Sequence, residues 1–136
     1  MPRIKQIHQL IRFSISGVAG FLVDAGIVAL CTQTVGMKPI PSQAAAFSVA
    51  VTVTWLINRH WTFAEHASER WLHELIRYLL TNSVGAAINN SVYIILVLTT
   101  IFFSEEPVLA VAAGSVAGMI FNFSLSKHLV FKKQLP

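Results

Sequence analysis

The chain has 136 residues, of which 54% are hydrophobic and only 12% are charged, whereas roughly 25% are charged in an ordinary soluble domain. With a mean hydropathy of +0.64, so short a chain cannot bury its apolar sequence in one globular core, which excludes a soluble domain and leaves lipid as the solvent. The formal net charge of +4 belongs to short segments between apolar runs, which leaves no folded basic domain and excludes nucleic acid as a partner.

Four apolar segments each reach or approach the ~20 residues that cross a hydrocarbon core. They are, approximately, residues 13–35, 40–57, 78–103 and 108–125. Because these runs lack strand-like alternation, they predict helices rather than a closed barrel. The expected fold is therefore an all-α integral membrane protein with four transmembrane helices.

The first and third helices begin with the same pattern. Residues 7–13 read IHQLIRF and residues 72–78 read LHELIRY. The correspondence continues into the apolar sequence, where Gly17 falls on Asn82, Gly20 on Gly85 and Asp24 on Asn89. We therefore expect one domain over 1–136, built as two parallel-repeat hairpins at approximately 7–63 and 72–131. Each amphipathic lead-in predicts a short interfacial helix before the first and third spans.

Basic residues gather on one side of the expected bundle. They are Arg3, Lys5 and Arg12 before the first helix, Arg59, Arg70 and Arg77 between the second and third, and Lys127, Lys132 and Lys133 after the fourth. Only Lys38 lies in the first hairpin loop, and the second loop carries Glu105 and Glu106. The positive-inside rule then places both termini and the middle loop in the cytoplasm.

Asp24 is a carboxylate inside the first span. It lies ~18 Å along a helix from Arg12, close to the bilayer midplane. An aspartate there costs about 2.5–3.5 kcal/mol on insertion scales, so it should face the bundle and find a partner. Two interpretations stay open: a proton-linked or substrate-contacting carboxylate, or a protonated Asp24 that hydrogen-bonds Asn89 or Asn90 across the bundle.

Small residues recur at four-residue spacing in the second and fourth helices. The two stripes are Ala46, Ala50, Thr54 and Asn58, and Gly114, Gly118, Asn122 and Ser126. Stripes of this kind form close helix contacts, which we also expect of Gly17, Gly20 and Gly85. Gly114 and Gly118 can pack within the chain or dimerise it, and the sequence does not choose.

The second helix ends in Asn58-Arg59-His60-Trp61-Thr62-Phe63 and the fourth in Ser126-Lys127-His128-Leu129-Val130-Phe131. One interpretation is a cytoplasmic anchor of snorkelling cations and aromatic residues, with Trp61, Phe63, Trp71 and Phe131 at the interface. For the cations we favour a binding role, because Arg12, Arg59, Arg77 and Lys127 place one cation per helix at one membrane depth. Such a ring suits a phosphate or pyrophosphate, with Asn58, Asn82 and Asn122 as neutral donors.

The sequence contains no motif typical of a catalytic or metal-binding site. There is no glycine-rich phosphate loop and no nucleophile elbow. Glu65, His66, Glu69 and His73 have no convincing metal spacing and are expected to be solvated. We therefore expect no enzyme, no catalytic residue, no cofactor and no metal.

The pattern of motifs resembles the GtrA-like family. The resemblance rests on Arg12-Phe13, Gly17 and Asp24, on Asn58-Arg59-x-Trp61-x-Phe63, and on Asn122-Phe123 with Lys127 and Phe131. It covers approximately Leu10 to Phe131. In the second half, Lys127 and Leu129 stand where the family usually has Arg and Trp.

This resemblance implies a small bacterial inner-membrane protein that acts in cell-surface polysaccharide glycosylation. Its implied role is to move a polyprenyl-phosphate-linked sugar, with undecaprenyl phosphate as the expected carrier, from the cytoplasmic to the outer leaflet. In this interpretation the cations capture the lipid phosphate, and Asp24, Asn82, Asn89 and Asn90 form a polar track for the sugar.

Other partners and functions stay open. Membrane lipids and a membrane glycosyltransferase are expected partners, and a 15.0 kDa bundle is thin for enclosing a headgroup, so we expect a homo-oligomer. One alternative function is a non-transporting adaptor that positions the glycosyltransferase. Another is a proton-coupled exporter of small cations. This alternative is the less favoured, because the predicted ring of cations would repel such substrates.

Overall fold

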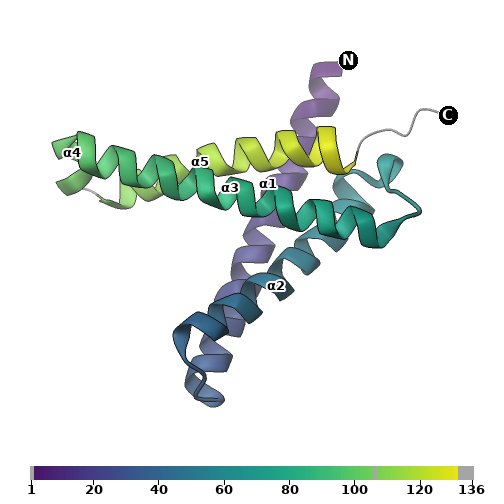
Figure 1. Ribbon diagram of the computed structural model, residues 1–136. Coiled ribbons are helices and arrows are strands. Elements are labelled where there is room, and N and C mark those ends of the chain that lie inside the picture. The colour runs from purple at the N-terminus through teal and green to yellow at the C-terminus, as the bar shows by residue number, and fades with distance from the viewer. Residues whose placement is uncertain (1, 106, 132–136) are drawn as a thin grey trace. The chain divides into compact units, whose positions relative to one another are not determined.

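The computed structural model describes residues 2–105 and 107–131 (Figure 1). In chain order its elements are α1 (Pro2–Ala29), the π-helical turn η1 (Leu30–Thr34), α2 (Pro39–Ile57), the π-helical turn η2 (Asn58–Thr62), the 3-10 turn η3 (Ala64–His66), α3 (Trp71–Thr99), α4 (Ile101–Glu105), α5 (Pro107–Leu125) and the π-helical turn η4 (Ser126–Val130). The residues described contain no strand, so the predicted all-α class is confirmed.

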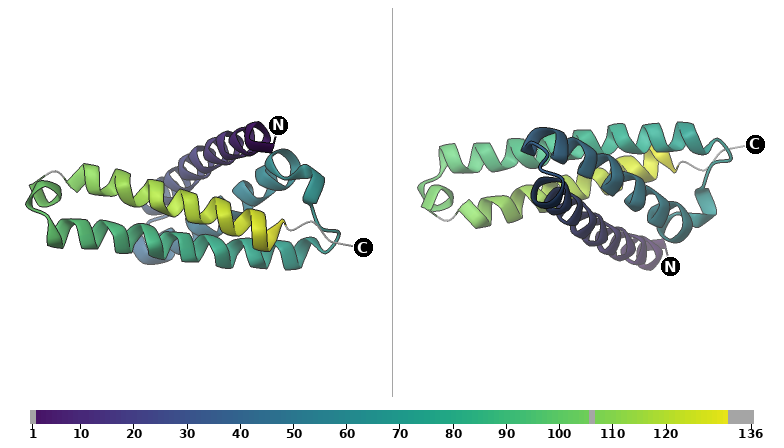
Figure 2. Two further views of the ribbon diagram at one scale, coloured as in Figure 1. Left: turned by 90° about the horizontal axis from the view of Figure 1, so that it is seen from above. Right: turned by 90° about the horizontal axis from the view of Figure 1, so that it is seen from below.

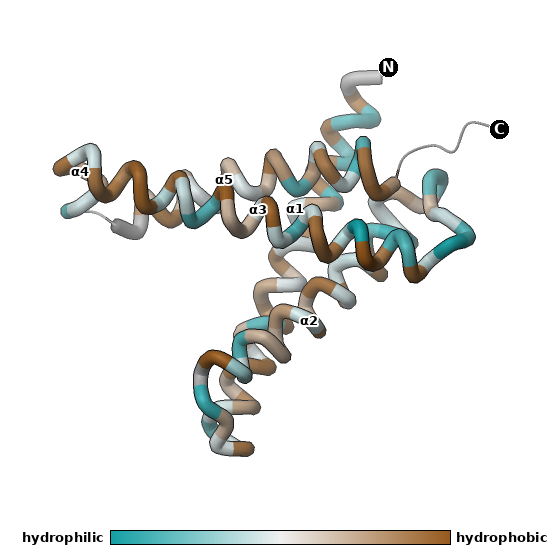
Figure 3. Tube along the Cα trace, in the orientation of Figure 1, coloured by the Kyte–Doolittle hydropathy of each residue, from teal (hydrophilic) through white to brown (hydrophobic). Residues whose placement is uncertain are grey.

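Within the described part of the chain, four helices are long and apolar enough to cross a membrane. They are Ile4–Thr34, Ile40–Thr62, Trp71–Thr99 and Leu109–Val130. Many of their large apolar side chains are exposed, including Phe21 at 68% and Leu98 at 79%, as expected where lipid is the solvent. Polar residues gather instead at the start of α1 and between α2 and α3 (Figure 3). The protein is therefore a multi-pass membrane protein with four candidate spans. Glu106, Lys132 and Lys133, which entered the charge pattern, lie outside the described residues.

The lead-in segments are not separate surface helices, so that prediction is wrong. α1 runs without a break from Pro2 to Ala29. α3 runs unbroken from Trp71 to Thr99, and the short turn η3 is the helical element that precedes it. The reason is local, because neither lead-in contains a glycine or proline that would end one helix before the span begins.

Chain contacts divide the protein into two compact units, one ending at Leu75 and the other comprising Ile76–Lys132. The boundary lies close to the predicted boundary between the repeats. In the first unit α1 and α2 form a hairpin that turns at Gly36, whose φ of +72° is accessible to glycine at little cost. α2 begins with Pro39 and includes Pro41 in its first turn. Proline is tolerated there because the first turn of a helix does not need its N–H.

The α1–α2 contact uses the predicted small-residue stripe of α2. The Ser16 hydroxyl donates to the carbonyl of Thr54 at 3.3 Å. A side chain at Gly20 would collide with the methyl group of Thr54 and would lie 3.9 Å from the carbonyl oxygen of Ala50. The contact is therefore close because Gly20 has no side chain. A Cβ added at Gly17, in contrast, would meet no described residue within 4 Å, so Gly17 makes no close contact in this hairpin and its packing role stays a prediction.

The second unit repeats this arrangement with α3 and α5, which run side by side (Figures 1 and 2). A Cβ on Gly85 would overlap the side chain of Asn122, and one on Gly118 would lie 2.9 Å from the carbonyl oxygen of Gly85. A Cβ on Gly114 would lie 2.6 Å from the carbonyl oxygen of Asn89. These glycines thus pack within the chain, which answers the question that the sequence left open.

Each hairpin is closed by an aromatic pair at a π-helical turn. The N–H of Phe63 donates to the carbonyl of Asn58, and that of Phe131 to Ser126, both at 2.8 Å. Phe63 lies edge-on to Phe13 with ring centroids 6.2 Å apart, and Phe131 lies edge-on to Tyr78 at 6.1 Å. Phe63 and Phe131 are only 1% and 2% exposed, so the prediction that they are interface anchors is wrong. The extra residue of a π-helical turn redirects the side chains that follow, which regular helical spacing cannot anticipate.

Candidate functional site

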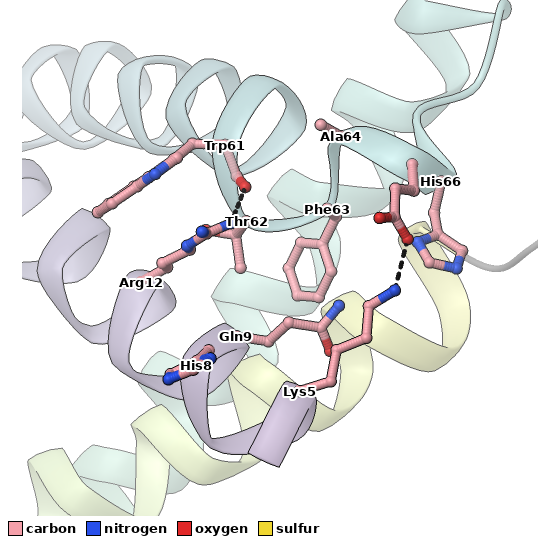
Figure 4. Close-up of a pocket in the computed structure, with 10 residues that line it drawn as sticks. Lys5, His8, Gln9, Arg12, Trp61, Thr62, Phe63, Ala64 and His66 are labelled. Atoms are coloured by element: carbon pink, nitrogen blue, oxygen red, sulfur yellow. Dashed lines mark hydrogen bonds and ion pairs between the residues drawn. The ribbon is translucent and has the colours of Figure 1, made fainter. Parts of the chain in front are cut away.

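The first unit contains a polar hollow of 280 Å³ between the start of α1 and the segment after α2 (Figure 4). We call it the first hollow. Its lining residues are Lys5, His8, Gln9 and Arg12 from α1, and Trp61, Thr62, Phe63, Ala64, Glu65 and His66 from the end of η2 through η3. Helical spacing brings the four α1 residues together, because positions i, i+3, i+4 and i+7 share one face.

Arg12 is held in place on the wall of this hollow. Its Nη1 donates to the carbonyl oxygen of Trp61 at 3.2 Å, and its guanidinium carbon lies 5.5 Å from the centroid of the Trp61 ring. Figure 4 shows the side chain reaching from α1 toward that carbonyl. The carbonyl uses one of five guanidinium N–H groups, so Arg12 is oriented but keeps donors for a ligand.

An ion pair crosses the first hollow from α1 to η3. Lys5 Nζ and Glu65 Oε2 are 2.7 Å apart, and their side chains are 63% and 69% exposed. The hydrogen bond from Lys5, together with its positive charge, lowers the pKa of the Glu65 carboxyl. Exposed pairs of this kind contribute little to stability because water and salt screen them.

The lining of the first hollow is rich in hydrogen-bond donors. Lys5, Gln9 and Arg12 all carry N–H groups, and His8 and His66 add imidazole rings. Of the ten lining residues, all of them described, Glu65 alone carries a carboxylate. A hollow with this balance fits an anion that accepts several hydrogen bonds, such as a phosphate group.

The second unit has a shallow hollow at the corresponding place, which we call the second hollow. It measures 440 Å³ and is lined by Arg77, Leu80, Thr81, His128 and Leu129. Arg77 is exposed, and its guanidinium makes no hydrogen bond, ion pair or ring contact with any residue that the structure describes. His128 Nδ1 lies 2.8 Å from the carbonyl oxygen of Ser124. That carbonyl can only accept, so Nδ1 carries the proton and Nε2 points elsewhere.

Both hollows place an arginine of the first helix of a hairpin beside the π-helical turn that ends the second. The sequence profile described as GtrA/DPMS, transmembrane domain, matches residues 12–131. The chain belongs to the GtrA/DPMS transmembrane-domain family. The matched range begins at Arg12 and ends at Phe131, so it contains the π-helical turns η2 and η4 and both arginines of the hollows.

Arg59 has a different environment from the one that the sequence predicted for it. Its Nη1 lies 2.7 Å from Glu74 Oε1, and the two side chains are 17% and 1% exposed. Its Nη2 donates to the carbonyl of Ser68 at 2.8 Å, and its guanidinium carbon lies 5.6 Å from the Trp55 ring centroid. Arg59 is absent from the lining of the first hollow. Its prediction as a phosphate ligand is therefore corrected to a structural role.

Glu74 is the centre of this buried cluster. Its Oε1 also accepts from Trp55 Nε1 at 3.0 Å, and its Oε2 accepts from the Ser68 backbone N–H at 2.6 Å. The carboxylate thus ties the first turn of α3 to the end of α2 and to the loop before α3. All of these residues belong to the first unit.

The remaining predicted phosphate ligands have mixed environments. Asn58 is 1% exposed, and its Oδ1 accepts from the Thr62 hydroxyl at 2.7 Å, so this donor is turned inward. Asn122 lies against Gly85, and its buried Oδ1 has no hydrogen-bond partner among the described residues. Lys127 has its ammonium 5.8 Å from the Phe123 ring centroid. A ring of four cations stays a prediction, because its members belong to different units.

Asp24 finds a partner that the sequence did not suggest. The Gln43 amide Nε2 lies 3.2 Å from both carboxylate oxygens of Asp24. Gln43 could have been suspected, because it is a polar residue near the start of an otherwise apolar and small-residue helix. Whether Asp24 also meets Asn89 or Asn90 stays a prediction.

Of the other residues of the predicted polar track, Asn82 and Asn89 are seven residues apart and share one face of α3, whereas Asn90 lies on another. Asn82 Nδ2 donates to the Tyr78 carbonyl of its own helix at 2.8 Å. Asn89 packs against Gly114 and Gly118, whereas Asn90 is exposed. Trp61 and Trp71 are 41% and 55% exposed, which suits the predicted interface anchors.

Sequence reasoning missed several residues of the site. Lys5, Gln9 and Glu65 of the first hollow, His128 of the second and the buried Glu74 were not predicted to act in binding or support. One signal was available for Glu74, because it is an acid where the first repeat has Gln9. An acid that is present in only one of the two repeats suggests a local partner, which for Glu74 is Arg59.

Proposed function

We propose that this GtrA/DPMS family protein moves a polyprenyl-phosphate-linked sugar from the cytoplasmic to the outer leaflet of the bacterial inner membrane, with undecaprenyl phosphate as the carrier. The family setting supports the proposal, because the GtrA-like proteins that it resembles act in cell-surface polysaccharide glycosylation. The positive-inside rule supports a topology in which both termini and both hollows face the cytoplasm. A membrane glycosyltransferase and further copies of the chain are the proposed protein partners.

The observation that carries the proposal is Arg77 in the second hollow, whose guanidinium has no partner among the residues that the structure describes. An arginine at the end of a membrane span lies at headgroup depth, where its guanidinium can bind the phosphate of a lipid. A phosphodiester can accept a bidentate pair of hydrogen bonds from its guanidinium. His128 also lines the hollow, from the turn that follows α5, and can add a further donor when it is protonated.

The surroundings of Arg77 suit a lipid rather than a free anion. Leu80 and Leu129 flank the hollow and are 60% and 53% exposed. Exposed apolar side chains beside a cation allow the phosphate to bind at headgroup depth while the prenyl chain stays in the hydrocarbon region.

The route of the sugar is revised by the hairpin contacts. Ser16 and Gly20 are buried against α2, so a sugar cannot follow their face of α1 without parting the hairpin. The Asp24–Gln43 pair, which lies within the first unit, keeps polar atoms available. We propose that this pair forms hydrogen bonds with the sugar hydroxyls during transfer.

Replacing Arg77 by alanine is expected to reduce sugar delivery to the outer leaflet about tenfold or more, since charge-assisted hydrogen bonds contribute about 1.5–3 kcal/mol. The measurement is surface labelling of the transferred sugar in cells that carry the variant as their sole copy, at matched protein levels. Arg70→Ala is the matched control, because it removes an exposed arginine that lines neither hollow. Normal delivery by Arg77→Ala would contradict the proposal.

A further inference from the structure

We propose that the first hollow binds the phosphate group of an anionic lipid headgroup. In the absence of lipid the Glu65 carboxylate pairs with Lys5, and the bound phosphate displaces it. The inference rests on the proposed function in one respect, because it takes the class of lipid from that function. It goes beyond that function because it assigns a second site and an internal competitor that controls it.

The donor balance of the first hollow identifies the ligand as an anion with several acceptor oxygens. Arg12 is oriented by the Trp61 carbonyl and ring and still has N–H groups to donate. Gln9 and Lys5 extend the same face of α1 by one and two turns. A phosphate oxygen bridging these donors would form charge-assisted hydrogen bonds, which are about twice as strong as neutral ones.

Glu65 already behaves as an internal substitute for such an anion. Its carboxylate lies 2.7 Å from Lys5 Nζ across the hollow, in the place where an oxygen of a bound phosphate would accept. A glutamate is charged at neutral pH, and the hydrogen bond and charge of Lys5 lower the pKa of the Glu65 carboxyl further. The contact is easily displaced, because exposed ion pairs contribute only about 0–1 kcal/mol.

An apolar stripe on α1 identifies the anion as a lipid headgroup. Ile4, Ile7, Ile11, Ile15, Val18 and Leu22 are each at least 50% exposed. Their spacing of three or four residues keeps them on one helical face that begins beside Lys5 and Arg12. An acyl or prenyl chain can therefore lie along α1 into the hydrocarbon region while its phosphate occupies the hollow.

The control by Glu65 is specific to the first hairpin. The second hollow is lined by Arg77 and His128 and includes no carboxylate among its lining residues, which are all described. The first hollow is thus occupied by its own acid when no lipid is bound, whereas the second is open.

The test measures lipid binding by native mass spectrometry of the full-length protein in phosphatidylcholine nanodiscs. The probes are undecaprenyl phosphate and phosphatidylglycerol in the nanodisc, and inorganic phosphate in solution. Glu65→Gln is expected to raise the affinity for the lipid probes about twofold to fivefold, because it removes the competitor. Lys5→Gln and Arg12→Gln are expected to lower it, by about threefold and about tenfold. Glu69→Gln, an exposed acid outside the hollow, is the control and should leave the affinity unchanged.

Each outcome decides a part of the inference. Binding of both lipid probes with a gain in Glu65→Gln supports a lipid-phosphate site under internal competition. Equal affinity for inorganic phosphate would overturn the lipid assignment, and an unchanged or weaker affinity in Glu65→Gln would overturn the role of Glu65. If lipids bind in this way but the wild-type protein moves no lipid-linked sugar, the proposed function fails and this inference stands. If the sugar is moved normally and no variant changes lipid binding, this inference alone fails.

Discussion

Replacing Arg59 by alanine is expected to destabilise the protein by about 3–5 kcal/mol, which is the usual cost of removing one partner of a buried ion pair. The substitution leaves the Glu74 carboxylate, 1% exposed, without its cation. The N–H groups of Trp55 and Ser68 still donate to Glu74, but they cannot neutralise its charge. The measurement is equilibrium unfolding in mixed micelles, followed by tryptophan fluorescence.

Two further variants show whether the loss comes from the ion pair. Lys127→Ala removes the repeat-equivalent cation, whose ammonium lies over the Phe123 ring, and should cost no more than about 1 kcal/mol. Adding Glu74→Gln to Arg59→Ala should recover part of the lost stability, because the neutral amide removes the buried charge and keeps one oxygen that can accept from Trp55 or Ser68. If Arg59→Ala is as stable as Lys127→Ala, the structural role of the Arg59–Glu74 pair is contradicted.

Replacing Gly114 by alanine is expected to destabilise the second hairpin by about 1–3 kcal/mol, the usual cost of overpacking. The new Cβ would lie 2.5 Å from the side-chain Oδ1 of Asn89 and 2.6 Å from its carbonyl oxygen. The carbonyl belongs to the backbone of α3, so relief requires α3 and α5 to move apart. Equilibrium unfolding in mixed micelles measures the loss.

The matched control for this variant is Gly17→Ala. A Cβ at Gly17 would meet nothing within 4 Å, and alanine is favoured over glycine inside a helix by about 0.5–1 kcal/mol. Gly17→Ala should therefore leave stability unchanged or raise it slightly. Equal losses in the two variants would mean that Gly114 does not make the close contact described for the second hairpin.

The spans could be predicted from the sequence because lipid imposes a simple requirement. Continuous apolar runs of sufficient length must be helical, and their limits in the structure agree with the sequence to within a few residues at α2 and α5. Helical spacing also predicted the close contacts of Gly20, Gly85, Gly114 and Gly118. Gly17 makes no such contact with α2, because a position three residues from Gly20 can turn away from the neighbouring helix.

The candidate site could be predicted only in part. The sequence identified Arg12 and Arg77, since both recur at the same place in the repeat. It could not separate them from Arg59, because all three are arginines near the end of a span. The difference lies in the partners: Arg59 meets a buried carboxylate that is 15 residues away in the sequence, and the Lys5–Glu65 pair joins residues 60 apart. Pairings of that range depend on how η2 and the following loop fold, which periodicity does not encode.

The most direct test of the central claim uses the purified wild-type protein alone in liposomes that contain a polyprenyl-phosphate-linked sugar in both leaflets. The measurement is the fraction of lipid-linked sugar that a membrane-impermeant oxidant can reach with time. The account predicts that the protein makes the inner-leaflet pool accessible, and that Arg77→Ala slows this exchange while Arg70→Ala does not. If the inner pool stays protected with the wild-type protein and becomes accessible only when a membrane glycosyltransferase is added, translocation by this protein is contradicted and a role as an adaptor is favoured.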